Sequence, residues 1–295
     1  MYSLETEKAS ITSPGTINAL SSEYEEWLET QPFSEHTKRN YRSKVRYFLG
    51  FVEALPACDG PDALLDPARY PLLVASYSAF LRDSLLSRMS TVNNCLTAID
   101  NFYAFLGLCA HSVKREKVAR ENMRVMSQED NSKLQQVLVS SASGKERAIV
   151  AIFLETGIRL SECAALNVCD LAISDSLGKL NIYNKRNSSC REVQLNEAAR
   201  APLQAWLKER NDRFALSEKS ALFVNYLGER ISTAGLDFLI RKIGIRARMN
   251  LSAQILRDTC LATLARNSKD PFLVAEIGGF KQLDSSRKYF GLVFP

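Results

Sequence analysis

Apolar residues recur at every third or fourth position along most of the chain, and this spacing predicts amphipathic helices. The first hundred residues contain four such segments, which predict one small bundle. Ser34 is the expected N-cap of the second helix, and Ser90 or Thr91 that of the fourth, because a hydroxyl oxygen can accept a hydrogen bond from a first-turn amide. The four expected helices cover residues 17–30, 34–53, 70–83 and 90–108.

A second series of helices follows a charged stretch. Residues 111–126 have no clear apolar stripe, so we interpret them as a linker. Ser127, followed by Glu129 and Asp130, is a typical helix start, and the helical pattern then resumes. The expected helices of this second domain cover residues 128–140, 144–157, 158–166, 196–212, 232–247, 252–267 and 270–279.

Residues 171–195 interrupt the helical pattern. Strand-like pieces at 180–183 and 191–195 flank a polar turn, which predicts a small hairpin or a three-stranded sheet. The expected fold class is therefore mainly α, with an N-terminal four-helix bundle and an α-rich second domain that contains a small antiparallel sheet.

Length and composition agree with two domains inside the cell. The chain has 295 residues, 46% of them hydrophobic, which is enough for two sizeable cores. Its seven cysteines are an odd number and contain no CxxC pair, so we expect neither a disulfide framework nor a bound metal or cofactor. Free thiols indicate a reducing compartment, so we expect a cytoplasmic location. No apolar stretch reaches the roughly 18 residues that span a bilayer, and residues 1–16 are polar, without a signal peptide, and are expected to be flexible.

The charged residues narrow the chemistry. The net charge of +5 permits a polyanionic partner without requiring one. The only histidines are His36 and His111, so the second domain must do its chemistry without imidazole.

Three residues of the second domain are candidates for chemistry. Arg159 begins an expected helix, where it would either bind an anion or point into solvent. Arg257 has apolar neighbours, and because an unpaired buried charge is costly, it needs an anionic partner such as Asp258 or Glu162. Tyr289, taken alone, would more often be a packing residue than a nucleophile.

Together these residues resemble the tyrosine recombinase (phage integrase) family, closest in size and layout to its Xer-type members. The matching segments are TGIRLSE at 156–162, QILRD at 254–258 and IGGF at 277–280, and Tyr289 lies nine residues beyond the last of them. The resemblance covers nearly the whole chain. It implies a SAM-like, core-binding DNA-binding domain over 17–110 and a catalytic domain over 127–295.

The resemblance implies a site-specific DNA recombinase. Arg159 and Arg257 would hold the non-bridging oxygens of a DNA phosphodiester, and Tyr289 would attack phosphorus to form a 3′-phosphotyrosyl intermediate without metal or ATP. Lys185 on the expected hairpin would protonate the leaving 5′-oxygen. Arg186 is the alternative for that place, and an arginine has too high a pKa to be a good acid.

Three positions depart from the family pattern, which has histidine there. Gln254 can still donate a hydrogen bond to a phosphate oxygen, whereas Phe280 keeps packing and loses the donor. Asp258 would either orient Arg257 or partly neutralise it. Losing one transition-state donor typically costs about 10²–10³ in rate, so we expect a slow or inactive enzyme. The apolar residues near the C-terminus are expected to dock as a short plug, in cis or in trans, and the alternative is a frayed end; they are Phe290, Leu292, Val293 and Phe294.

The expected partner is double-stranded DNA, bound by a tetramer on two sites, with a second recombinase subunit left open and no membrane. Two groups of basic residues are the expected contacts to DNA, and the alternative for them is a solvated basic face. The first group would lie along phosphates and is Lys38, Arg39, Arg42, Lys44 and Arg46. The second lies on the helix over 232–247, which would read bases together with the four-helix bundle, and is Arg241, Lys242 and Arg246.

Other functions compete with recombination. A catalytically weak DNA-binding relative would act as an accessory or regulatory partner. A type IB-like relaxing enzyme would use the same covalent chemistry without pairing two DNA sites, and an unrelated helical scaffold would share the spacing by chance. Integration, excision and chromosome dimer resolution are not separated by the sequence.

Overall fold

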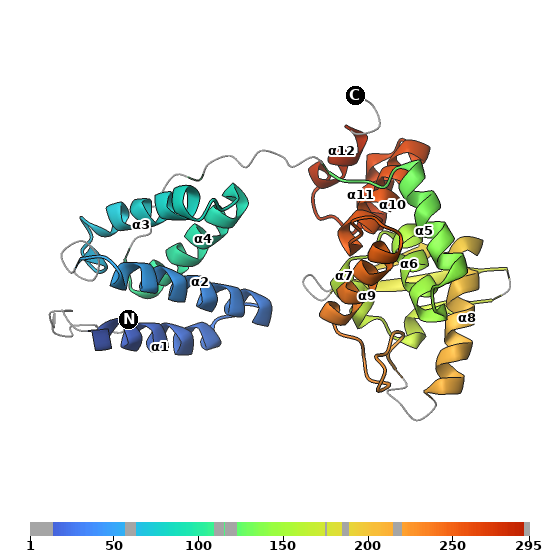
Figure 1. Ribbon diagram of the computed structural model, residues 1–295, viewed down its shortest axis with the longest axis horizontal. Coiled ribbons are helices and arrows are strands. Elements are labelled where there is room, and N and C mark those ends of the chain that lie inside the picture. Colours follow the sequence, from blue (N-terminus) through green and yellow to red (C-terminus); the bar gives the residue numbers. More distant parts are fainter. Residues whose placement is uncertain are drawn as a thin grey trace. The chain divides into compact units, whose positions relative to one another are not determined.

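The computed structural model describes residues 14–56, 63–108, 115, 123–174, 176–184, 189–214 and 220–291. The chain divides into two compact units, Met1–Glu121 and Asn122–Pro295 (Figure 1). This division falls inside residues 111–126, whose composition predicts a linker. Residues 1–13 of the expected flexible N-terminus lie outside the described residues.

The N-terminal unit contains the four predicted helices. They are α1 (Pro14–Thr30), α2 (Glu35–Glu53), α3 (Tyr70–Ala79) and α4 (Met89–Phe105). Ser34 caps α2 as predicted, because its hydroxyl accepts a hydrogen bond from the Thr37 amide. The third helix is shorter than expected, and a π-helical turn, η2 (Phe80–Ser84), continues it.

The predicted N-cap of α4 is wrong. The helix begins at Met89, so Ser90 and Thr91 lie inside its first turn, and the extended residue Arg88 occupies the cap position without a side-chain hydrogen bond. Burial of the apolar stripe that starts at Val92 decides where this helix lies. The general preference for a hydroxyl at the N-cap is the weaker effect here.

Aromatic rings dominate the core of the N-terminal unit. Tyr24, Phe48, Phe102 and Tyr103 are almost completely buried, and Tyr24 meets Phe102 edge to face at a centroid distance of 5.3 Å. The Tyr24 hydroxyl donates a hydrogen bond to Oδ1 of Asn101 at 2.8 Å, so this buried polar group is satisfied.

The C-terminal unit is mainly helical, as predicted, with a small sheet. Its first elements are α5 (Gln128–Ser140), α6 (Gly144–Thr156), α7 (Leu160–Ala165) and the 3₁₀ turn η3 (Val168–Asp170). After the sheet follow α8 (Glu197–Arg213), α9 (Thr233–Arg246), α10 (Ala253–Ser268), α11 (Pro271–Gly278) and α12 (Asp284–Phe290). Ser127 caps α5, as predicted, through a reciprocal capping box with Asp130.

The sheet has three antiparallel strands in the order β1–β2–β3, which confirms the three-stranded prediction. They are β1 (Leu171–Ile173), β2 (Gly178–Asn184) and β3 (Ser189–Gln194). Tyr183 pairs with Cys190 next to the turn between β2 and β3. The turn itself, residues 185–188, lies outside the described residues.

The short helix α12 was not predicted. It carries Tyr289, and its seven residues, DSSRKYF, are too few and too polar to show a helical stripe. It forms because it packs on a small apolar cluster that Tyr289 shares with Leu261, Ala265 and Val274. Tertiary contacts therefore decide its structure.

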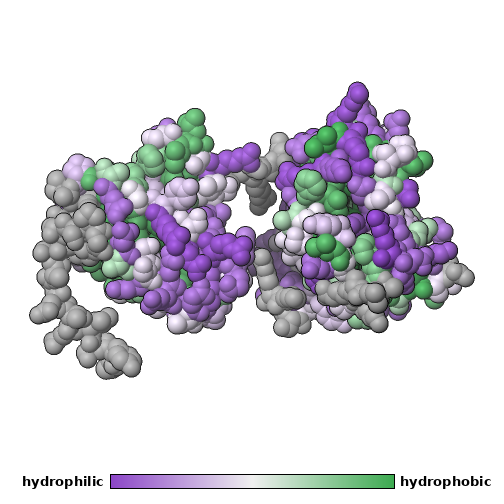
Figure 2. Space-filling view, turned by 60° about the horizontal axis from the view of Figure 1, so that its bottom comes forward, coloured by the Kyte–Doolittle hydropathy of each residue, from purple (hydrophilic) through white to green (hydrophobic). Residues whose placement is uncertain are grey.

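Most large apolar side chains lie in the cores of the two units. On the face shown in Figure 2, hydrophilic residues predominate and hydrophobic residues form smaller patches among them. Within the described ranges, no helix combines the length and the apolar composition that crossing a bilayer requires.

Candidate active site

Arg159 lies at the N-terminus of α7, directly after the end of α6. Gly157 ends α6 in the left-handed region, with φ of 56°, and the chain is extended at Arg159. The guanidinium donates hydrogen bonds to Oε1 of Glu162 at 2.8 Å and to the carbonyl of Gly279 at 2.7 Å. One third of its side chain stays exposed, so this cation is both fixed and accessible.

Arg257, on α10, is buried and has no carboxylate partner among the described residues. Its guanidinium donates hydrogen bonds to the carbonyls of Gly157 and Gly278, the latter at 2.6 Å. The proposed partners Asp258 and Glu162 are therefore wrong for this contact. Both carbonyls lie at helix C-termini, where unpaired carbonyls carry partial negative charge. Burial, followed by nearby Arg159, lowers the pKa of Arg257 to about 10.

Arg191, on β3, is a third arginine of the site that the sequence reading missed. It donates hydrogen bonds to both carboxylate oxygens of Glu162, at 3.2 and 2.7 Å, and its Nε donates to the carbonyl of Ile277 at 2.9 Å. The alternation of β3 was the available signal, because Arg191 lies two residues before buried Val193 and shares its face.

Glu162 is the buried carboxylate that Arg159 and Arg191 share. Burial alone would raise its pKa, but hydrogen bonds and charge from Arg191, followed by hydrogen bonds from Arg159, outweigh that effect and lower it. The carboxylate therefore stays ionised and holds two guanidinium groups at fixed positions.

The C-terminal end of α11 accepts all three arginines. The carbonyls of Ile277, Gly278 and Gly279 accept hydrogen bonds from Arg191, Arg257 and Arg159, in that order. Gly279 has φ of 59°, and a Cβ there would lie 2.8 Å from Arg191 Nη1 and 3.0 Å from Arg159 Nη1. Glycine is therefore required both by the backbone and by the close approach of the guanidinium groups.

Phe280 connects the arginines to Tyr289. Its ring lies 5.8 Å from the guanidinium carbon of Arg159, 5.2 Å from that of Arg257 and 6.0 Å from the Tyr289 ring centroid. Both arginines are thus within cation–π distance of one ring. The structure brings together four of the predicted site residues, namely Arg159, Arg257, Phe280 and Tyr289.

A groove of about 510 Å³ opens beside this cluster. Arg159 is one of its walls, and neither Arg257 nor Tyr289 is among its lining residues. The residues that line it are Arg159, Ser161, Glu162, Ala165, Tyr183, Asn184, Gly279, Phe280, Lys281 and Ser285. It lies between the arginine cluster and the end of β2, so an anion bound there would meet Arg159 first.

The C-terminal unit matches a known protein family. Residues 124–293 match the model of the Phage integrase family. The chain belongs to this family. It is therefore a tyrosine-type site-specific recombinase by family, a class of enzyme that breaks and rejoins DNA.

Individual relatives extend over nearly the whole recombinase chain. Tyrosine recombinase XerC of Pseudomonas fluorescens (strain Pf-5) is 26% identical over 273 residues, which cover 88% of this chain and 87% of the relative. The structure of XerH recombinase bound to a palindromic difH substrate, after cleavage, has a TM-score of 0.72 at 17% identity and covers 98% of this chain and 88% of that chain. A lambda integrase dimer bound to a COC′ core site has a TM-score of 0.65 at 13% identity, over 92% and 94%. At these identities the two structures show a common fold.

Of the remaining predicted catalytic residues, the structure describes Gln254. Gln254 is exposed near the start of α10, three residues before Arg257, and this spacing places both on neighbouring sides of the helix. Lys185 and Arg186, the two candidates for the proton donor, lie outside the described residues.

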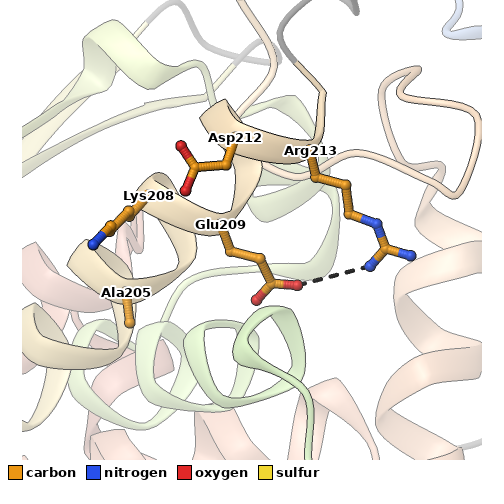
Figure 3. Close-up of a pocket in the computed structure, with 5 residues that line it drawn as sticks. All are labelled: Ala205, Lys208, Glu209, Asp212 and Arg213. Atoms are coloured by element: carbon orange, nitrogen blue, oxygen red, sulfur yellow. Dashed lines mark ion pairs between the residues drawn. The ribbon is translucent and has the colours of Figure 1, made fainter.

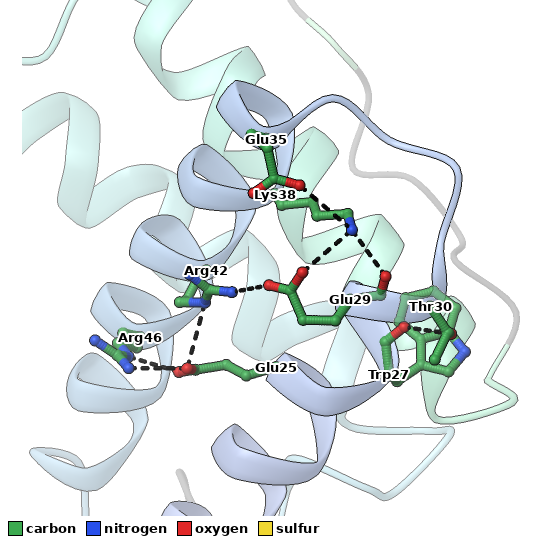
Figure 4. A network of polar contacts seen from close by, with 8 residues as sticks. All are labelled: Glu25, Trp27, Glu29, Thr30, Glu35, Lys38, Arg42 and Arg46. Carbon is green, nitrogen blue, oxygen red and sulfur yellow. Dashed lines mark hydrogen bonds and ion pairs between the residues drawn. The ribbon is translucent and has the colours of Figure 1, made fainter.

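The basic residues of α2 lie against acidic residues of α1 (Figure 4). Lys38 is buried, and its ammonium donates hydrogen bonds to the carbonyl and the carboxylate of Glu29, at 2.8 and 3.2 Å. Arg42 pairs with Glu29 and Glu25, and Arg46 forms two hydrogen bonds with Glu25, at 2.7 and 2.9 Å. These three cations therefore hold two helices together, which the run of basic residues did not indicate.

The other basic residues differ in their exposure and in their ion pairs. Arg39 and Lys242 are exposed, and Lys44 is half-buried. Arg241 pairs with Asp237 on the same helix at 2.7 Å. Arg246 donates hydrogen bonds to Glu146, also at 2.7 Å, and to the carbonyl of Ser141.

A second hollow lies on α8 and has no part in the arginine cluster (Figure 3). Lys208, Glu209, Asp212 and Arg213 line it, and Glu209 pairs weakly with Arg213 at 3.9 Å. Two cations and two anions on one exposed helix face do not favour a ligand of either charge.

Proposed function

We propose that the recombinase cuts DNA with Tyr289 as the nucleophile and with Arg159 and Arg257 as the ligands of the scissile phosphate. Attack on phosphorus would form a 3′-phosphotyrosyl intermediate and free a 5′-hydroxyl, which later attacks a partner strand. The bond energy is kept in the covalent link, so the step requires neither metal nor ATP.

One observation carries this proposal. Arg159, Arg257 and Tyr289 come from three different helices or helix ends and lie around the single ring of Phe280. Helix-terminal carbonyls hold Arg257 without cancelling its charge, and Arg159, which shares the single carboxylate of Glu162 with Arg191, stays one third exposed. Preorganised cations of this kind stabilise the charge that develops on a pentavalent phosphorus.

In this proposal the rate of cleavage depends on the substituted positions Gln254 and Phe280 and on the proton donor. Gln254 is exposed and can donate its amide N–H to a phosphate oxygen, whereas Phe280 supplies only packing. Lys185 is our choice for the acid that protonates the leaving oxygen, with Arg186 as the alternative. Because each lost donor typically costs about 10²–10³ in rate, we expect a slow enzyme.

DNA binding and assembly are part of the same proposal. Arg39 and Lys44 would lie along phosphates, and the helix that carries Arg241 and Lys242 would read bases. The unit over 17–110 would act as the core-binding domain. The XerH and lambda integrase structures contain DNA, the latter as a dimer, which supports duplex DNA as the partner. We further propose a tetramer on two sites and a cytoplasmic location; the five cysteines of the described ranges are all free thiols.

An accessory role is the second candidate. Arg257 and Tyr289 are buried in this structure, and Phe280 carries no hydrogen-bond donor. If these features abolish cleavage, the protein would still bind DNA and would serve as a regulatory partner of another recombinase.

Covalent trapping separates the two candidates. The protein is incubated with a nicked suicide duplex taken from the borders of its own gene, denatured, and examined for a DNA-linked band. We expect a band that is absent in Tyr289→Phe. DNA binding in a gel shift without any band would overturn the enzyme proposal and favour the accessory role.

A further inference from the structure

One buried hydrogen bond has no part in the chemistry proposed above. The hydroxyl of Tyr289, on α12, donates to Oδ1 of Asp258, on α10, at 2.7 Å. Tyr289 is 0% exposed and Asp258 5% exposed. A carboxylate therefore holds the nucleophile inside the protein.

In this position the phenol cannot attack DNA. Its ring packs among Leu261, Ala262, Ala265 and Val274, and it contributes nothing to the groove that Arg159 lines. Burial, followed by the hydrogen bond to Asp258, raises the pKa of Tyr289 well above its ordinary value. The hydroxyl is thus kept protonated as well as enclosed.

The start of the C-terminal unit adds to this enclosure. Met123 and Val125 pack against the cluster that contains Tyr289. The next residue, Met126, donates its amide hydrogen to Oγ1 of Thr259 at 2.9 Å, one position after Asp258. The segment 123–126 therefore lies over the same part of α10 that binds the phenol.

We propose that Asp258 is a positioning residue that retains Tyr289 in a buried resting state, from which the phenol must be released before it can reach a phosphate. The proposal rests on the function of Tyr289 as the nucleophile. Release breaks one hydrogen bond, keeps the proton on the phenol and leaves a carboxylate that water or a basic group must solvate. In this scheme Asp258 sets how often the nucleophile is available.

The first test uses the full chain without DNA. Tetranitromethane nitrates accessible tyrosines, and mass spectrometry reports the rate at Tyr289, with buried Tyr24 as the reference for the N-terminal unit. The fluorescence of Trp206, which is buried in the C-terminal unit, checks that this unit stays folded. We expect Asp258→Asn to raise the rate at Tyr289 at least tenfold without changing that at Tyr24. The matched control Asp237→Asn, which breaks an ion pair on α9, should leave both rates unchanged. A rate at Tyr289 within twofold of the unmodified chain in Asp258→Asn would overturn the proposal.

A second variant covers the case in which Asp258→Asn fails to fold. Tyr289→Phe removes the same hydrogen bond and keeps the ring. We expect amide hydrogen exchange of Arg287–Phe290 to become at least fivefold faster than in the unmodified chain. Unchanged exchange would show that the bond does not hold α12 and would contradict the proposal.

Covalent trapping then separates retention from proton transfer. If Asp258 retains Tyr289, the folded Asp258→Asn variant forms the DNA-linked band at least as fast as the unmodified chain, which a merely structural role would not produce. If Asp258 instead accepts the phenol proton during attack, the band forms about 10²-fold or more slowly, and the proposal fails. If no variant forms a band, the proposed function fails, whereas the nitration and exchange results still decide the role of Asp258.

Discussion

Arginines hold together two parts of this recombinase, and they do so in opposite ways. On α2, Arg42 and Arg46 meet the carboxylates of Glu25 and Glu29, so positive and negative side chains balance. In the C-terminal unit, two of three guanidinium groups share one carboxylate, that of Glu162, whereas the third, that of Arg257, binds backbone carbonyls. The first group is neutralised and the second keeps an excess of positive charge.

This difference shows that the partner, and not the density of basic residues, decides where an anion can bind. The α2 segment has the more conspicuous run of cations in the sequence, yet most of that charge serves an interface between two helices. A carbonyl satisfies the hydrogen bonds of a guanidinium without cancelling its charge. Arginines held by carbonyls therefore remain available for a phosphate.

Breaking one carboxylate in each region gives the largest contrast. We expect Glu162→Gln to lower the free energy of unfolding by about 3 kcal/mol, because removing one partner of a buried ion pair leaves the other charges unpaired. Glu25→Gln, in the partly exposed α1–α2 network, should cost at most about 1 kcal/mol. Urea unfolding of both variants measures the two values, and equal losses would contradict the comparison.

The stability of Glu162→Gln should also depend on pH differently from that of the unmodified chain. Because the pKa of Glu162 is lowered in the folded state, its contribution is present above the unfolded carboxyl pKa of about 4.3 and is lost as the pH falls through the folded value. The unmodified chain should therefore lose stability faster than Glu162→Gln below about pH 4.3. Parallel curves for the two proteins would exclude Glu162 as the group responsible.

Two glycines sharpen the comparison at a smaller scale. Gly279→Ala places a Cβ in a left-handed conformation and against two guanidinium groups, so we expect a loss of about 2 kcal/mol. Gly50→Ala, on the exposed face of α2 with nothing within 4 Å, should stabilise by about 0.5–1 kcal/mol. Thermal unfolding measures both, and a neutral Gly279→Ala would show that the arginines do not depend on this close approach.

The smallest expected effect is a change in the salt dependence of DNA binding when basic residues of α2 are replaced. Among the described residues Arg39 has no ion pair, whereas Arg46 binds Glu25 through two hydrogen bonds. We expect Arg39→Gln to reduce the slope of log K against log salt by about one phosphate contact, and Arg46→Gln to change it less. Fluorescence anisotropy over a salt series tests this, and a larger change for Arg46→Gln would reverse our assignment.

Much of the fold followed from periodicity. The helices with long apolar stripes and the three-stranded sheet lie where the pattern predicts them, and Ser34 and Ser127 cap helices as expected. The helix α12 did not follow, because its seven residues have no stripe of their own. It depends on apolar residues that the two preceding helices, α10 and α11, supply.

The candidate site was predictable in its residues but not in its partners. The motifs around Arg159, Arg257 and Tyr289 indicate which side chains matter. They do not show that Arg257 binds carbonyls or that Asp258 binds the phenol, because such partners depend on how helix ends meet. Arg191 was missed for the same reason, since its partners lie on α7 and α11.

The end of α11 also constrains the order in which this recombinase can fold. Its three terminal carbonyls accept arginines that lie 120, 86 and 21 positions away along the chain. Contacts over such separations form late, because a long loop must close before they can be made. Until α11 docks, each of the three guanidinium groups lacks one of the hydrogen-bond partners that fix its position. The arginine cluster is therefore incomplete in a partly folded chain, and the site proposed for the scissile phosphate is available only in the finished molecule.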